Sequence, residues 1–571
     1  MKFFHVYNEE YFEGLEKNNL INEDTGFKIQ HVFSLPENKK FNQFAAKGSK
    51  LHSMVKEGNI PFYVDRIAGG VTYHKYNFDK ALIREYREML GDWFLGFQLH
   101  ESGGNRRLDW DRVLQRMDGE KGPYDLETLA KRSIRDYAVT PDGQTLYGFS
   151  QGSPEEYAAG KYPTTLNDYI ADITELYKTR MEETDGMILP CDSFYQFEYV
   201  QNKLGMRSFM PEVGAQIPHM RMAVAAARGM ALANNKQWGV YYECWRTTKE
   251  TGSTMPCFNK EPGNEWYLTQ ETHRDDFTSF GPNGGSSRLL QNRIYHYGLM
   301  SGAQFMGEEW GLNCSYSDMK TFELSPYGLV KKDFIEFARG HKNVQAQIPF
   351  AIVLPVEYPS IQLLQDNLGV RREKYMTREM TPEQVEYYGK VEDVIRLFLS
   401  RNKEKDAIGN EGHVMQNTRF GDLFDIVYED ASAEALSRYA YLIDATAGRF
   451  ADENAGQYKI LRSEDLDKLA NDVNRIAKEL LPCTVDKLHW LLSSDENGRY
   501  VTIFNNEGNE RDINLGDIIH HEADAVVKVA FKTPVDVKCI RSTSDNVKIT
   551  KIDNTTYAVE IPATEFVILS Y

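Results

Sequence analysis

Eight short apolar runs, separated by helical stretches, fill the first part of this chain, up to about residue 340. The runs are rich in β-branched and aromatic residues, and their alternation with helices is typical of βαβ units in a parallel sheet. Eight such strands in one region favour a closed barrel over an open sheet. The runs are Phe3–Tyr7, Lys28–Phe33, Pro61–Ile67, Phe94–His100, Gly186–Cys191, Arg207–Glu212, Trp238–Trp245 and Ala303–Trp310. The clearest helical patterns between them are Asp79–Leu90, Thr165–Glu183, Pro218–Ala233 and Ser287–Ser301.

The remaining chain predicts two further domains. The chain has 571 residues, and single hydrophobic cores stop growing at roughly 250–300 residues. Residues 346–485 contain apolar runs at Pro349–Pro355, Phe424–Tyr428 and Tyr441–Ala445, with helical patterns near 382–402 and 463–481. This order predicts a small open α/β domain of the Rossmann or flavodoxin type. It has no GxGxxG sequence, so we expect subunit contact rather than nucleotide binding there.

The last segment, residues 486–571, alternates apolar and polar residues with a period of two. Asn-Gly and Asp-Asn pairs interrupt the alternation, as they do in hairpin turns. We therefore predict an α/β protein: a (β/α)₈ TIM barrel over residues 1–345, the Rossmann-like domain, and a C-terminal antiparallel β-sandwich.

Charge and hydropathy limit the partners. The formal net charge is −18, from 84 acidic and 66 basic side chains, and a field of this sign repels phosphate backbones and anionic lipid. No apolar run is long enough to span a bilayer. The start, MKFFHVYNEEYFEGLEK, lacks the apolar stretch of a secretory signal. We expect a cytoplasmic protein that binds neither nucleic acid nor membrane.

Glutamates close four of the predicted strands. They stand in the segments GFQLHESGG (Glu101), FMPEVG (Glu212), VYYECW (Glu243) and FMGEEWG (Glu308 and Glu309). An acidic group at the end of an apolar strand is costly to bury unless it has a role, and in a barrel these strand ends meet at one face. Hydrolysis of a glycosidic bond needs one carboxylic acid and one carboxylate. The pattern therefore favours a glycosidase.

Two of these glutamates carry a resemblance to known enzymes. Glu101 closes the fourth predicted strand and Glu243 the seventh, which is similar to glycoside hydrolase clan A. Gly96–Glu101 (GFQLHE) resembles the GWQxxNE stretch of family 42 β-galactosidases, although it is one residue shorter and has His100 in place of Asn. Tyr241–Trp245 (YYECW) stands where that family has its nucleophile. The order of domains resembles family 42 and the related family 164 β-mannosidases.

This resemblance implies a retaining, exo-acting β-glycosidase. Glu243 would be the nucleophile and Glu101 the acid and base, and the α/β domain would form a homotrimer. The Asn that binds the 2-hydroxyl group in the family is replaced here by His100, so the substrate is left open between a β-galactoside and a β-mannoside, as part of an oligosaccharide or simple glycoside.

Other residues near the strand ends suit sugar binding. Aromatic residues make up 12% of the chain, and such rings stack on the apolar face of a pyranose. No HExxH or similar ligand spacing occurs, so we predict no metal and no cofactor in catalysis. The residues expected to bind the sugar are Asp65, Arg66, His100, Asp192, Glu212, Trp245, Arg246, Glu308 and Trp310.

Three alternatives stay open. Glu212 or Glu308 would serve as nucleophile in a glycosidase of different linkage specificity. A non-catalytic carbohydrate-binding barrel would keep the fold without turnover. An aldolase or isomerase would need a Schiff-base lysine or a metal cluster at a strand end, and the predicted strand ends show no convincing lysine.

Overall fold

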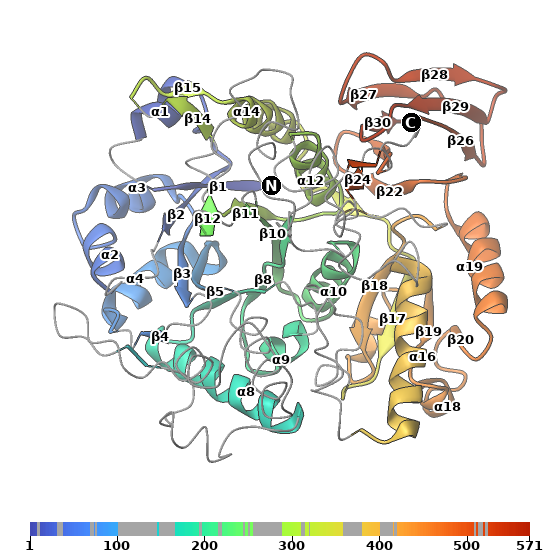
Figure 1. Cartoon of the computed structure of the whole chain (residues 1–571), viewed down its shortest axis with the longest axis horizontal. Helices are drawn as coiled ribbons and strands as arrows, with labels where there is room; N and C mark the ends of the chain where they lie inside the picture. Colours follow the sequence, from blue (N-terminus) through green and yellow to red (C-terminus); the bar gives the residue numbers. More distant parts are fainter. Residues whose placement is uncertain are drawn as a thin grey trace.

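The computed structural model of the chain is shown in Figure 1. It describes residues 1–7, 12–30, 38–68, 73–74, 77–100, 146–147, 166–192, 197–214, 220–243, 246–248, 252–254, 288–309, 315–318, 320–357, 380–399, 415, 420–506, 510–511, 518–519 and 524–571. Within these residues, no helix combines the length and the apolar character that crossing a bilayer requires.

A parallel sheet curls into an almost closed barrel. Its strands are β1 (Lys2–Val6), β2 (Thr25–Gln30), β3 (Phe62–Ala68), β5 (Phe94–His100), β7 (Ile188–Cys191), β8 (Ser208–Phe209), β9 (Glu212–Gly214), β10 (Gln237–Glu243) and β13 (Phe305–Glu308). The order is β7-β5-β3-β2-β1-β13-β10-β8, and β9 also pairs with β10. Between the two edges, the Glu212 amide donates to the Asp192 carbonyl at 3.1 Å. Since β8 and β9 occupy one barrel position, all eight predicted strands are confirmed.

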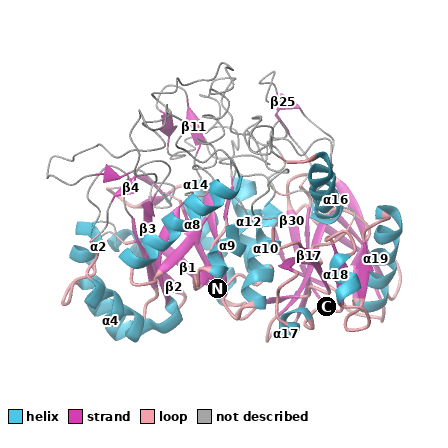
Figure 2. Cartoon of the chain, turned by 90° about the horizontal axis from the view of Figure 1, so that it is seen from below, coloured by secondary structure: helices cyan, strands magenta, loops and turns pink. Residues whose placement is uncertain are grey.

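Helices surround this barrel (Figures 1 and 2). The four predicted helices are present as α4 (Lys80–Leu90), α8 (Leu166–Glu183), α10 (Met220–Ala233) and α12 (Arg288–Met300), followed by α14 (Pro326–Arg339). Local signals set some of their starts. Asp79 caps α4 by accepting from the amides of Ala81 and Leu82, and Ser325 caps α14 just before a proline. The short strands β4 (Tyr73–His74) and β11 (Arg246–Thr248) follow β3 and β10 at one end of the barrel.

The barrel interior is filled by one cluster of side chains, which consists of Phe4, Tyr63, Leu95, Leu189, Cys191, Met210, Tyr241 and Phe305. Apolar residues of the opposite parity, such as Val64 and Val240, belong to the core shared with the helices. Gly307 lies between the interior side chains, since a Cβ there would stand 2.5 Å from the Tyr63 hydroxyl. Alternation along each strand therefore decides which rim residues face the barrel axis.

A bulge changes this alternation in β5. The pairing of β3 with β5 shifts register at Gly96, which has φ +92°, and a Cβ at Gly96 would meet the Met187 carbonyl oxygen at 2.5 Å. Leu95 belongs to the interior cluster, whereas Phe97 belongs to the outer core. The extra residue brings His100 into line with the interior.

A second parallel sheet follows the barrel. Its strands are β17 (Phe350–Leu354), β18 (Phe424–Tyr428), β19 (Tyr441–Asp444) and β20 (Ile460–Arg462), in the order β18-β17-β19-β20. Helices α16 (Pro382–Leu399) and α19 (Leu466–Leu480) accompany it. The three predicted strands and both predicted helices of this region are present, and the strand order is that of a doubly wound sheet. Its role in subunit contact stays a prediction.

Most of the described C-terminal strands form two antiparallel sheets, and β24 (Glu510–Arg511) pairs separately with β25 (Ile518–Ile519). The first has the order β16-β22-β23-β30-β27, from β16 (Gln345–Ala346), β22 (His489–Ser494), β23 (Arg499–Phe504), β30 (Phe566–Ser570) and β27 (Lys538–Ser542). The second has the order β21-β26-β29-β28, from β21 (Cys483–Val485), β26 (Ala525–Phe531), β29 (Thr556–Ile561) and β28 (Lys548–Lys551). Strands β16 and β21 precede residue 486, so the predicted division into domains at 345 and 485 stays a prediction.

Helix α10 touches strand β18 so closely that only glycine fits. A Cβ at Gly229 would stand 2.2 Å from the Ile426 carbonyl oxygen. We expect Gly229→Ala to lower the free energy of unfolding by about 1–3 kcal/mol, because the backbones must separate. The matched control is Gly389→Ala in α16, where a Cβ meets nothing within 4 Å and helix propensity favours alanine by up to about 1 kcal/mol. Urea unfolding of both variants tests this, and equal effects would contradict it.

Candidate active site

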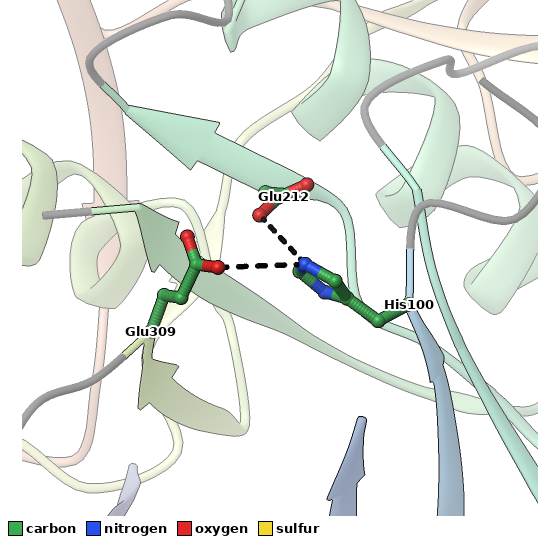
Figure 3. Close-up of side chains that lie close together, drawn as sticks. All are labelled: His100, Glu212 and Glu309. Carbon is green, nitrogen blue, oxygen red and sulfur yellow. Dashed lines mark ion pairs between the residues drawn. The ribbon is translucent and has the colours of Figure 1, made fainter. Parts of the chain in front are cut away.

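Three side chains from different strands converge at the C-terminal end of the barrel (Figure 3). His100 ends β5, Glu212 begins β9, and Glu309 directly follows β13. The His100 Nε2 atom lies 3.6 Å from Glu212 Oε1 and 3.5 Å from Glu309 Oε1. All three side chains are fully buried. Two carboxyl groups therefore share one imidazole in the interior of the barrel mouth.

Strand alternation explains why these residues meet. Glu212 lies two residues beyond Met210 of the interior cluster, and Glu309 lies four residues beyond Phe305. Positions an even number of residues apart point to the same face of a strand. His100 joins them because of the bulge at Gly96.

Asp65 lies beside this cluster and has two partners. Lys28 Nζ donates to Asp65 Oδ2 at 2.8 Å, and the Tyr241 hydroxyl donates to Asp65 Oδ1 at 3.0 Å. The ring of Tyr241 lies edge-on to the ring of His100, with centroids 5.5 Å apart. The predicted sugar-binding residue Asp65 is thus part of a buried polar layer that extends to His100.

Lys28 lies further along its strand than the sequence predicts. Strand β2 begins at Thr25, three residues before the predicted start, so Lys28 lies well inside the strand and its side chain is buried at the barrel mouth. The expectation that the strand ends offer no convincing Schiff-base lysine stays a prediction. The Lys28 ammonium group also donates to the Glu308 carbonyl, so it links β2 to its neighbour β3 and to β13, which lies beyond β1. These contacts favour a structural use over a Schiff base.

Glu308 differs from its neighbour Glu309. Its carboxylate lies 2.5 Å from Lys331 Nζ of α14 and accepts from the Tyr295 hydroxyl of α12. The side chain therefore packs among the helices outside the barrel, and this environment gives no support to sugar binding or nucleophilic attack by Glu308. The sequence analysis names Glu309 without a role, because alternation along the strand selects Glu309 only once Phe305 is known to face the barrel interior.

The other predicted site residues are described in part. Asp192 follows β7, is buried, and helps to close the barrel through its carbonyl. Near it, burial raises the pKa of Glu198 in α9 (Phe197–Lys203) well above the usual range, and the charge of Asp192 adds to this. For three predicted residues the structure gives the backbone only: Arg66 in β3, Glu243 at the end of β10 and Arg246 in β11. Glu101, Trp245 and Trp310 lie outside the described residues.

The arrangement has two chemical capacities. Buried carboxyl groups at a barrel mouth can hold or accept protons and stabilise positive charge in a reacting molecule. An imidazole flanked by two carboxylates can also hold a divalent metal ion. In barrel enzymes, the loops that follow the strands form the active site at this C-terminal face.

Comparisons with known proteins give only weak likenesses. No family model matches the sequence, and no curated protein matches it. Among solved structures, α-L-fucosidase isoenzyme 2 from Paenibacillus thiaminolyticus is 10% identical, with 100% of this chain and 99% of that chain covered and a TM-score of 0.39. GH5_18 from Streptomyces cattleya, in complex with GlcNAc, is 9% identical, with 81% of this chain and 99% of that chain covered and a TM-score of 0.30. α-Amylase from H. orenii is 10% identical, with 100% of this chain and 99% of that chain covered and a TM-score of 0.22. TM-scores this low transfer no function to this chain.

Proposed function

We propose that this protein is a retaining glycoside hydrolase that removes a terminal β-linked sugar at the C-terminal mouth of the barrel. The main support is the convergence of buried carboxyl groups there, with Asp65, Glu212 and Glu309 contributed by different strands. Glycoside hydrolysis uses a pair of carboxyl groups that act on the glycosidic bond. The C-terminal mouth of a barrel is the usual place for an active site.

Two further glutamates are proposed to carry the chemistry. Glu243 is the last residue of β10 and pairs with Gly214 in β9, the strand that begins with Glu212. Glu101 directly follows His100 in the chain. The backbone of Glu243 therefore belongs to the rim next to the buried cluster, whereas Glu101 lies outside the described residues. A retaining mechanism requires the two carboxyl groups to stand about 5–5.5 Å apart.

The proposed reaction is a double displacement. The Glu243 carboxylate attacks the anomeric carbon while Glu101 gives its proton to the departing glycosidic oxygen, so that one C–O bond forms as another breaks. Glu101, now a carboxylate, then takes a proton from water, and the resulting attack on the anomeric carbon releases Glu243 and the sugar with its original configuration. Glu212 remains the alternative nucleophile, as the sequence analysis proposes.

A panel of 4-nitrophenyl glycosides tests this function. We expect nitrophenolate release from the β-galactoside or the β-mannoside, and little from the β-glucoside, β-glucuronide and α-fucoside. The double variant Glu101→Ala, Glu243→Gln supplies the background rate from the same expression host. A folded protein that binds sugar and cleaves none of the five would contradict the proposal and favour a non-catalytic carbohydrate-binding barrel.

A 2-fluoroglycoside of the cleaved sugar then identifies the nucleophile. The fluorine slows breakdown of the glycosyl-enzyme, and digestion followed by mass spectrometry locates the labelled residue. We expect the label on Glu243. A label on Glu212 would assign that residue the nucleophile's role and leave the retaining mechanism intact.

A further inference from the structure

The spacing within the His100, Glu212 and Glu309 cluster is unusual for an ion pair. A charge-assisted hydrogen bond between nitrogen and a carboxylate is about 2.7–2.9 Å long, whereas the two separations from His100 Nε2 are 3.5 and 3.6 Å. The ligand atoms of all three side chains lie within 4.8 Å of one another. Figure 3 shows the three groups directed toward a common point.

These separations suit atoms that bind one metal ion. Zinc lies about 2.0–2.2 Å from imidazole nitrogen and carboxylate oxygen. Two ligands of the same ion at tetrahedral or octahedral angles are then roughly 3.0–3.5 Å apart. The distances from His100 match the upper end of this range, so a small contraction would complete the contacts.

Charge supports the same interpretation. Glu212 and Glu309 are fully buried, and two carboxylates this close repel each other unless a positive charge compensates them. A divalent cation would balance both carboxylates at once.

We propose that His100, Glu212 and Glu309 bind a divalent transition-metal ion at the barrel mouth. One imidazole and two carboxylates suit Zn²⁺ or Mn²⁺ better than Mg²⁺, which prefers oxygen ligands and retained water. Three protein ligands leave a coordination position for water or a substrate oxygen. The ligands are more than 90 residues apart in the chain, so a search for short spacings does not find them. This site goes beyond glycoside hydrolysis, and binding is measured without any substrate.

The test is direct metal binding by the full-length protein. After treatment with EDTA and its removal, the protein is titrated with ZnCl₂, MnCl₂ or MgCl₂ by calorimetry, and the metal content of protein purified without chelator is measured by mass spectrometry. We expect about one Zn²⁺ or Mn²⁺ per chain, weaker binding of Mg²⁺, and a higher Tm with bound metal, since a ligand of the native state stabilises it.

Variants separate this site from adventitious binding. His100→Ala and Glu309→Gln are each expected to weaken binding at least about a hundredfold, more than the loss of a supporting residue costs. Glu198→Gln is the matched control, because it removes another buried glutamate outside the cluster and should leave binding unchanged. Absence of stoichiometric binding by the folded protein would overturn the proposal, and so would binding that survives both ligand variants. Neither result bears on the proposed glycosidase activity, which the 4-nitrophenyl glycoside assay tests separately.

Discussion

Replacing Glu243 with Gln is expected to lower the turnover of the best 4-nitrophenyl β-glycoside by at least about a thousandfold, equivalent to roughly 4 kcal/mol of transition-state stabilisation. The amide keeps the volume of the side chain but removes the charge that attacks the anomeric carbon and stabilises the oxocarbenium-like transition state. Folding should be almost unchanged. Initial rates at saturating substrate, together with thermal unfolding, measure both effects.

The control is again Glu198→Gln, which should keep wild-type turnover. Burial raises the pKa of Glu198 well above the usual range, so the amide replaces a carboxyl group that already resists ionisation. Glu101→Ala should impair substrates with poor leaving groups far more than activated aryl glycosides. Azide should rescue that variant and yield a β-glycosyl azide if configuration is retained. Near-normal rates in both Glu101 and Glu243 variants would contradict the assignment and direct attention to Glu212.

The largest effect on stability is expected at Arg228, which joins the barrel to the second parallel sheet. From helix α10, its Nε donates to Asp425 Oδ1 at 2.6 Å, and its Nη2 donates to the Phe424 carbonyl at 3.1 Å and to Asp422 Oδ1 at 3.4 Å. Arginine and both carboxylates are buried. Arg228→Met should therefore cost about 3–5 kcal/mol, because it removes the guanidinium that bonds to both buried carboxylates. Urea unfolding at neutral pH measures the loss.

The pKa shifts of the two aspartates agree with this expectation. Burial opposes the ionisation of Asp422, but the Arg228 guanidinium and the nearby His489, whose Nε2 lies 3.9 Å from Asp422 Oδ2, outweigh it and hold the pKa of Asp422 well below its usual range. Burial dominates at Asp425 and raises its pKa despite Arg228. Without the guanidinium, burial would oppose ionisation at both sites.

Arg438→Met is the control for Arg228→Met at the same interface. Arg438 is exposed and donates to the Leu232 carbonyl at 2.8 Å and to Asn235 Oδ1 at 2.9 Å. Its loss should cost less than about 1 kcal/mol, because exposed polar pairs contribute little. Adding Asp422→Asn and Asp425→Asn to Arg228→Met should recover part of the lost stability. A cost for Arg228→Met no larger than that for Arg438→Met would refute the role assigned to this network.

Much of the fold was predictable from local pattern. All eight barrel strands and the four clearest helices between them follow from hydrophobic periodicity, which each segment carries in its own residues. The strands β17, β18 and β19 were found for the same reason. Strand limits were less certain, and the three-residue error at β2 hid the place of Lys28, because a pattern of mixed residues does not show where pairing with a neighbour begins.

The site shows where local pattern stops being sufficient. The residue types and the strand ends at which they gather were readable, since carboxyl groups closing apolar strands stand out in the chain. Which of two adjacent residues faces the barrel was not: His100 lies inside because of the bulge at Gly96, and Glu309 faces the cluster while Glu308 pairs with Lys331. These outcomes depend on the register between strands that are distant in the sequence, and a shift of one residue exchanges the two faces of a strand.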